Sequence, residues 1–345
     1  MKLISRFSLF LLMLGIIAPV YRTSAADKKI PPVSYHSAGE IPMGGEGGWD
    51  DLSADPAGHR LFISHSDRVV VVDTQEKKVI REITGTSGVH AIALALPLGK
   101  AFSSNGKEGT VGVIDLVSLT IKQKIKVEEN PDAIVYEPKH QHVYAFNGRS
   151  KSVSIIDAKE EKVLRTVSLP GKPEFAVVDP DLHRIFVNIE DKNSILAFDT
   201  DTQAIAATWP LENCESPSGI AIDVKNHRLF SVCENEKMVM VDSVLGKTLA
   251  SVPTGKGTDG AAFDPVSMLA FSPNGKSGTL TVVKEETPER MVVVENLKTQ
   301  LGARTMTIDP STHRIYLPTA EFATAEKGAR PKPVKGTQKI LVYEP

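Results

Sequence analysis

The sequence is poor in the groups that many enzymes use. Its 345 residues include only two cysteines, and aromatic residues make up 6%. It has no nucleophile elbow, no phosphate-binding glycine loop and none of the cysteine or histidine spacings of haem attachment or zinc proteases. Catalysis with a haem, a flavin or a nucleotide is therefore not expected.

A strong excess of positive charge is also missing, since the formal net charge is −2. A protein that binds nucleic acid normally presents a concentrated basic face. The one basic cluster is small and proline-rich, and its members are Lys327, Arg330, Lys332 and Lys335. Nucleic acid is therefore not the expected partner.

Long hydrophobic runs are absent except near the start of the chain. There, Lys2 and Arg6 precede or border an apolar run at residues 7–20, and the small residues Ser24, Ala25 and Ala26 follow. This pattern predicts a signal peptide over residues 1–26, cleaved near Ala25 or Ala26. The run is short for a membrane span. We expect a soluble periplasmic or secreted protein with no membrane span, and cleavage would remove three basic residues to leave a charge of −5.

What the chain does contain is a repeat. An acidic residue recurs every 42 or 43 residues, and its positions are Asp73, Asp115, Asp157, Asp199 and Asp242. Residues 173–211 show the unit most clearly, as four short runs rich in β-branched or aromatic residues and bounded by Asp, Asn, Pro or Gly. A period near 42 with four strands is typical of a β-propeller blade. The sequence thus predicts one all-β domain over residues 27–345, a seven-bladed β-propeller with four antiparallel strands per blade.

The blade boundaries predict how the ring closes. Blades are expected near residues 49–88, 89–130, 131–172, 173–216, 217–257, 258–302 and 303–345. The last blade has only three strand candidates, whereas residues 33–41 look like an outer strand without inner ones. We therefore expect this N-terminal strand to join the last blade and remove the free edges.

Segments such as SVSIIDAKEEKVLRTVSLPGKPEFAVVDP, residues 152–180, resemble the YVTN-type repeat of YncE-like seven-bladed propellers. The resemblance covers nearly all of the mature chain. It implies an exported propeller, usually without an assigned reaction, that acts as a binding or surface protein. There are two departures: Lys284 stands where blade six should have its aspartate, and blade seven carries an insertion at residues 319–338. The insertion is interpreted as a lid, a docking arm for an acidic partner, or a solvated loop.

The first residues of the innermost strands are the main site candidates, because in propellers they point to the axial channel on the face that binds most ligands. These channel-mouth positions are Asp50, His90, Asp132, Glu174, Ser218, Asp259 and Arg304. Converging carboxylates suit calcium or magnesium, with Asp132, Glu174 and Asp259 as candidate ligands, or a general base beside Arg304. The competing interpretation is a water-filled polar channel.

A second ring is expected at the ends of the second strands, where Asn is common for reasons of turn geometry. His65 and Glu321 are exceptions, and ring closure predicts that they are neighbours flanked by Arg304 and Asp50. Four His-Arg pairs begin second strands on the opposite face. We interpret them as corner residues that are too far apart to share one ion.

Cys214 and Cys233 are predicted to lie on one face near the join of blades four and five. In an oxidising compartment an even cysteine count favours a disulfide, and the alternative is two buried thiols.

Two functions remain open. The first is a binding or interaction module, expected to be a monomer, with a protein or small-molecule ligand at the channel mouth. The alternative is a metal-assisted hydrolase or lyase of the lactonase or streptogramin-lyase propeller type. Catalytic residues are not assigned.

Overall fold

The structure is a computed structural model that describes residues 34–324 and 331–345. The predicted signal peptide, residues 1–26, lies outside the described residues, and so does part of the blade seven insertion, residues 325–330. Within the described part, no helix has the length and apolar character needed to cross a bilayer.

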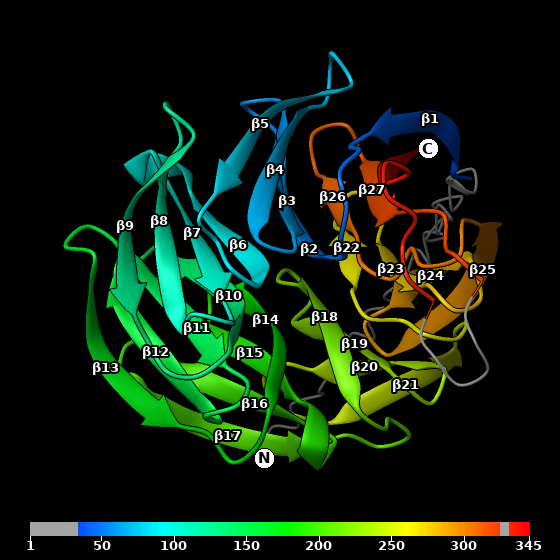
Figure 1. The fold of residues 1–345 in the computed structure, drawn as a ribbon. Coiled ribbons are helices and arrows are strands. Elements are labelled where there is room, and N and C mark those ends of the chain that lie inside the picture. The colour runs from blue at the N-terminus through cyan, green and yellow to red at the C-terminus, as the bar shows by residue number, and fades with distance from the viewer. Residues whose placement is uncertain (1–33, 325–330) are drawn as a thin grey trace, which may run out of the picture. The chain divides into compact units, whose positions relative to one another are not determined.

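Seven four-stranded antiparallel sheets make up the fold, as predicted (Figure 1). Blade one contains β2 (Trp49–Asp55), β3 (Arg60–His65), β4 (Arg68–Asp73) and β5 (Lys78–Thr84). Blade two contains β6 (Val89–Ala95), β7 (Lys100–Asn105), β8 (Thr110–Asp115) and β9 (Thr120–Lys126). Blade three contains β10 (Pro131–Glu137), β11 (His142–Asn147), β12 (Ser152–Asp157) and β13 (Lys162–Ser168). Blades four and five are β14 (Pro173–Asp179), β15 (Arg184–Ile189), β16 (Ser194–Asp199) and β17 (Ala204–Pro210); and β18 (Pro217–Asp223), β19 (Arg228–Cys233), β20 (Lys237–Asp242) and β21 (Thr248–Pro253). Blade six is β22 (Ala262–Asp264), β23 (Leu269–Asn274), β24 (Thr279–Thr287) and β25 (Arg290–Lys298), and blade seven is β1 (His36–Pro42), β26 (Thr307–Asp309), β27 (Arg314–Thr319) and β28 (Lys339–Glu344).

In the described part of the chain, two short 3₁₀ helices, η1 (Leu96–Leu98) and η2 (Glu190–Lys192), lie in loops. The innermost strands β2, β6, β10, β14, β18, β22 and β26 contact one another in this order, and β26 contacts β2. They therefore surround the channel, and the apolar side chains pack between neighbouring blades.

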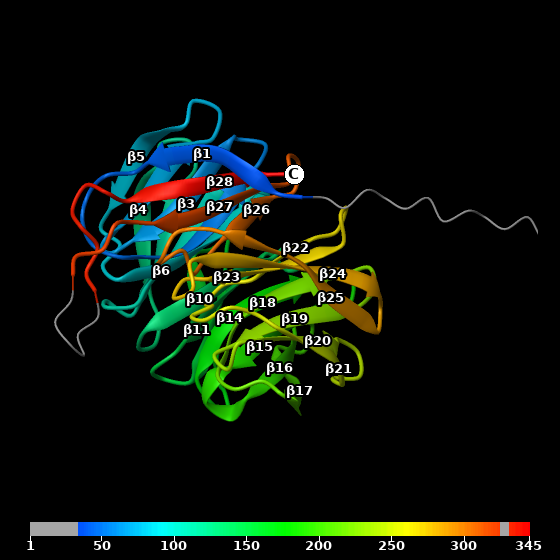
Figure 2. The ribbon, with the colours of Figure 1, turned by 90° about the vertical axis from the view of Figure 1, so that its right-hand side faces the viewer.

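The ring closes through the N-terminal strand. β1 pairs antiparallel with β28 at the outside of blade seven, with Ile41 opposite Ile340 (Figure 2). Ile41 is fully buried and packs in one cluster with Leu61 of blade one. This confirms the predicted closure, although the strand begins at His36 rather than at residue 33.

The His-Arg pairs occupy tight corners between first and second strands. His59, His183, His227 and His313 adopt positive φ values of 52°, 51°, 55° and 59°, a left-handed conformation in which histidine is more frequent than most residues. In blade one, Arg60 Nη2 lies 2.6 Å from the buried corner carboxylate Asp55 Oδ2. The pairs therefore define the turns of separate blades.

A candidate cation site at the channel mouth

Three consecutive inner strands bring two carboxylates and an imidazole together. Asp50 on β2 and Asp132 on β10 flank His90 on β6. His90 Nδ1 lies 2.7 Å from Asp50 Oδ2 and 3.5 Å from Asp132 Oδ1. One ligand atom from each residue lies within 4.8 Å of the other two, which is the spacing of a potential metal site.

Arg304 continues this chain of charges on the other side of Asp50. Its Nε lies 2.8 Å from Asp259 Oδ2 and its Nη2 lies 3.5 Å from Asp50 Oδ1. Nη2 also donates to the backbone oxygen of Trp49 at 2.9 Å. The guanidinium is therefore fixed between two carboxylates, and it partly neutralises this half of the ring.

Glu174 lies at the opposite end of this row of charged side chains and forms an ion pair with a lysine. Lys172 Nζ is 2.6 Å from Glu174 Oε1 and 2.5 Å from Glu190 Oε2. Glu190 begins η2, the 3₁₀ turn that follows β15. Partial burial lowers the pKa of Lys172, but its interactions with Glu174 and Glu190 outweigh burial and raise it, so Lys172 remains a cation.

Burial and mutual repulsion raise the pKa of several channel carboxyls. Burial, with the charges of Asp50, Asp259 and Asp132 adding to it, raises the pKa of Asp51 to about 8. Burial and the charge of Asp132 raise the pKa of Glu174 to about 8 in spite of Lys172. Burial also raises the pKa of Asp132 to about 6. Near neutral pH Asp51 and Glu174 therefore hold protons that they would lose in water, whereas Asp132 is mostly ionised.

The acidic neighbours of His90 raise its pKa. Burial disfavours the imidazolium, but hydrogen bonding to Asp50 and the charges of Asp132 and Asp50 outweigh it and raise the pKa of His90 to about 9. A metal ion at Nδ1 would have to displace this proton.

The space beside these groups is small. Asp50, Asp51, His90 and Asp132 line a cavity of about 30 Å³, whose other walls are mainly alanine and Phe175. This volume suits one or two waters or a small ion. Gly106 preserves the position of the imidazole, because a Cβ at residue 106 would lie 2.6 Å from His90 Nε2.

The remaining sequence candidates play different parts. Ser218 donates from its hydroxyl to the backbone oxygen of Asp259 at 2.9 Å, so it links two blades. His65 and Glu321 form no hydrogen bond or ion pair with each other: His65 is fully buried with both ring nitrogens unpaired among the described residues, whereas Glu321 is exposed. Burial lowers the pKa of His65 to about 4. β27 ends at Thr319, which places Glu321 beyond the strand.

Sequence reasoning missed Asp51, Lys172 and Glu190. The residue equivalent to Asp51 is alanine in blades two and three, so an acid at this position departs from the repeat. Lys172 holds a place that glycine occupies in blades one and two. A comparison of the repeats at these two positions would have found both residues, whereas Glu190 reaches the ring only through the fold.

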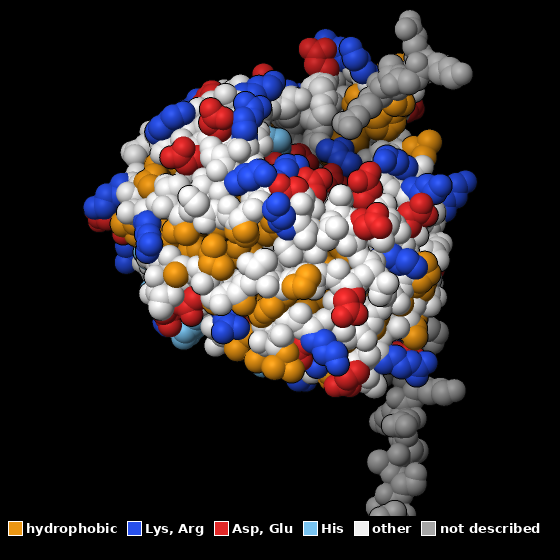
Figure 3. Space-filling model, turned by 90° about the horizontal axis from the view of Figure 1, so that it is seen from below, with side chains coloured by type: hydrophobic (Ala, Val, Ile, Leu, Met, Phe, Trp, Pro, Cys, Tyr) orange, Lys and Arg blue, Asp and Glu red, His pale blue; other side chains and the backbone are white. Residues whose placement is uncertain are grey.

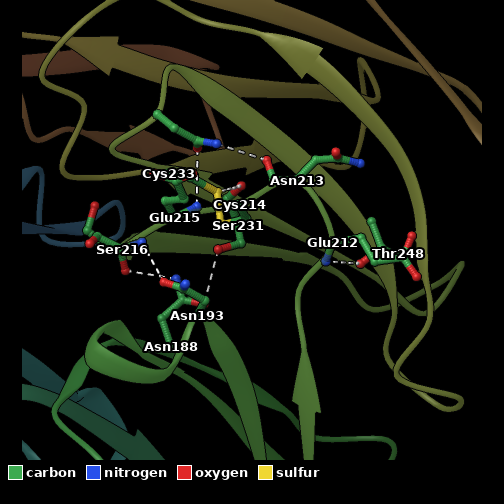
Figure 4. The surroundings of a disulfide bond; sticks show 12 residues. Asn188, Asn193, Glu212, Asn213, Cys214, Glu215, Ser216, Ser231, Cys233 and Thr248 are labelled. Atoms are coloured by element: carbon green, nitrogen blue, oxygen red, sulfur yellow. Dashed lines mark hydrogen bonds between the residues drawn. A yellow bond between two sulfur atoms is a disulfide. The ribbon is translucent and has the colours of Figure 1, made fainter.

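Cys214 and Cys233 form a disulfide with Cα atoms 5.3 Å apart (Figure 4). The surrounding loop is tied down as well: the backbone N–H of Ser216 donates to Asn193 Oδ1 at 2.9 Å, and that of Glu215 donates to Asn235 Oδ1 at 3.2 Å. This joins blades four and five on one face and makes the segment between β17 and β18 rigid.

No protein-family model and no curated protein sequence matches the chain. Among solved structures, hydrazine synthase of Kuenenia stuttgartiensis is similar with a TM-score of 0.71 and 17% sequence identity, over 79% of this chain and 92% of that one. The structure of U3-55K is similar with a TM-score of 0.73 and 8% identity, over 89% of this chain and 98% of that one. At such low identity these similarities show the propeller fold alone.

Proposed function

We propose that the protein is an exported β-propeller binding module, and that its channel mouth holds a divalent cation which forms part of the ligand or partner site. Export is supported by the basic, apolar and small-residue pattern of residues 1–26. The resemblance to YncE-like repeats supports a binding role.

The observation that carries the cation proposal is the meeting of Asp50, His90 and Asp132 within 4.8 Å beside a cavity of about 30 Å³. Carboxylate oxygens are the ligands that calcium and magnesium prefer. The cavity is far below the roughly 300 Å³ of a typical small-molecule pocket, so it favours an ion over an organic substrate. A partner would meet the ion from the open side of the channel.

Such a cation would compete with protons. Asp51 and Glu174 have pKa values of about 8, and His90 has a pKa of about 9. Each group loses its proton as the pH rises, which increases the negative charge of the channel and frees the imidazole. Calcium affinity should therefore rise by at least about tenfold from pH 6 to pH 9.

The test is isothermal titration of calcium and magnesium into signal-cleaved protein, with thermal melting in chelator as a second readout. We expect one ion per chain, an affinity that rises with pH, and loss of binding in Asp132→Asn. Gly106→Ala should also weaken binding, because its Cβ displaces His90, while Glu76→Gln at an exposed site on blade one should bind as the parent does. Binding that Asp132→Asn leaves intact, or no binding at about millimolar ion, would reject the cation site.

A metal-assisted hydrolase or lyase is the second candidate. Glu174 favours it, because a carboxyl with a pKa of about 8 can exchange a proton near neutral pH. The test is turnover of a panel of lactones. Turnover by the parent protein that is lost in Glu174→Gln or His90→Ala, while the melting temperature stays unchanged, would support the enzymatic function. A binding module should show no turnover in the parent protein.

A further inference from the structure

The outer strands of the blades differ in how they protect their free edges. Each blade ends in a strand with one neighbour in its sheet. β1, β5, β9, β13 and β25 contain Lys, Arg or Glu, whereas β17 reads AIAATWP and β21 reads TLASVP, with no charged residue. Charged side chains, lysine above all, prevent a strand edge from pairing with other chains. The edges of blades four and five therefore lack this protection.

The edge of blade four is also apolar. The side chain of Ile205 is 39% exposed, and Trp209 is half-buried. The turn of blade five rests on the indole, since a Cβ at Gly246 would lie 2.1 Å from Trp209 Cδ2, and this turn presents Leu245 at 73% exposure. In Figure 3, which views the side where β17 lies in Figure 1, hydrophobic side chains form a band across the face, with charged side chains among and around them.

Acidic residues stand at the end of this edge. Glu212 and Glu215 follow β17, Glu234 follows β19, and all three are exposed. None of them forms an ion pair with another residue in the described ranges 34–324 and 331–345. The Cys214–Cys233 disulfide and the hydrogen bond from Glu234 N to Glu215 O at 2.9 Å hold them in place (Figure 4). The carboxylates are thus pre-positioned beside an apolar strand.

We propose that β17 is a docking edge for an extended segment of a partner protein, which adds as a fifth strand and has an uncharged β-forming stretch with Lys or Arg at one end. Main-chain hydrogen bonds would hold the segment along β17. Trp209 and Leu245 offer the apolar contact, and tryptophan is enriched among residues that dominate binding. The basic end pairs with Glu212 and Glu215.

A second copy of this chain fits the edge less well. Two parallel β17 strands would place Glu212 beside Glu212, and two antiparallel ones would bring Glu212 towards Asp201 at the other end. Like charges across a strand pair are destabilising. The acidic end therefore selects a basic partner, independently of any cation in the channel.

Fluorescence anisotropy at low salt tests the proposal with three labelled peptides, KKTVTVTV, VTVTVTKK and EETVTVTV. We expect one of the two basic peptides to bind at least about tenfold more tightly than the acidic one. Ala206→Lys should weaken that peptide about tenfold by placing a cation on the edge. Glu212→Lys should reduce or reverse the preference for basic peptides.

The matched control is Thr166→Lys on β13, an exposed edge residue in a strand that already carries Lys162 and Arg165. It should bind the peptide as the parent does, and all variants should keep the parent melting temperature. The proposal would be overturned by any of three results: a loss of binding in Thr166→Lys equal to that in Ala206→Lys, no binding at about 1 mM peptide, or equal affinity for acidic and basic peptides. Self-association in sedimentation experiments that Ala206→Lys abolishes would assign the edge to a second copy instead.

Discussion

The buried carboxyl group of Glu285 should make stability fall as the pH rises. Glu285 is 2% exposed at the seam of blades five and six, and the corner carboxylate Asp223 is 1% exposed. Asn226 Nδ2 donates to Asp223 Oδ2 at 2.7 Å and to Glu285 Oε1 at 3.3 Å, while Glu285 Oε2 has no partner among the described residues. Burial, then the negative charge of the nearby Asp223, raise the pKa of Glu285 to about 7, against the opposing charge of Arg228.

The magnitude follows from the difference between this pKa and the ordinary value of 4.5. A carboxyl with a raised folded-state pKa contributes no penalty below the unfolded pKa; the penalty grows between the unfolded and the folded pKa and is complete above the folded pKa. At about 1.4 kcal/mol per pH unit, ionising Glu285 should cost about 3 kcal/mol of unfolding free energy by pH 8. Glu285→Gln removes this penalty, because the amide stays neutral and can donate to Asp223.

Urea unfolding of the parent, Glu285→Gln and Glu286→Gln between pH 4.5 and pH 8.5 measures the effect. Channel carboxyls also titrate in this window, so the quantity of interest is the difference between variant and parent at each pH. Glu285→Gln should gain about 3 kcal/mol relative to the parent between the acidic and alkaline ends. Glu286, whose side chain is 38% exposed, is the matched control and should follow the parent. A curve for Glu285→Gln that runs parallel to that of the parent would refute the reasoning.

Two further predictions concern stability. Deleting residues 36–42 should abolish cooperative thermal unfolding, because β28 loses its partner and the buried Ile41 is removed; a single sharp circular-dichroism transition in the deletion would contradict ring closure by β1. Replacing both Cys214 and Cys233 with serine should lower the unfolding free energy by about 3 kcal/mol, since the disulfide joins residues 19 apart in sequence; an unchanged urea midpoint would show that the hydrogen bonds of the loop suffice.

Much of the fold follows from the sequence alone. The 42-residue recurrence and the short runs between Asp, Asn, Pro and Gly predicted seven blades, because a strand's ends and its two-residue period are local properties. The missing fourth strand of blade seven predicted the part played by β1. The cysteines could be placed on one face by their positions in the repeat, and the disulfide in the structure joins them.

The tertiary structure decided what the channel residues do. Equivalent repeat positions placed Asp50, His90 and Asp132 in one ring of seven residues, with Asp132, Glu174 and Asp259 as the candidate ligands. Only the packing of neighbouring blades brings Asp50, His90 and Asp132 together and raises the pKa of Asp51. His65 and Glu321 do not pair, and β27 ends two residues before Glu321, a register that strand composition does not fix. The Asp223–Glu285 pair links residues 62 positions apart across two blades. Contacts of this kind arise from the packing of blades around the ring. The repeat pattern predicts the ring but not which side chains meet between its blades.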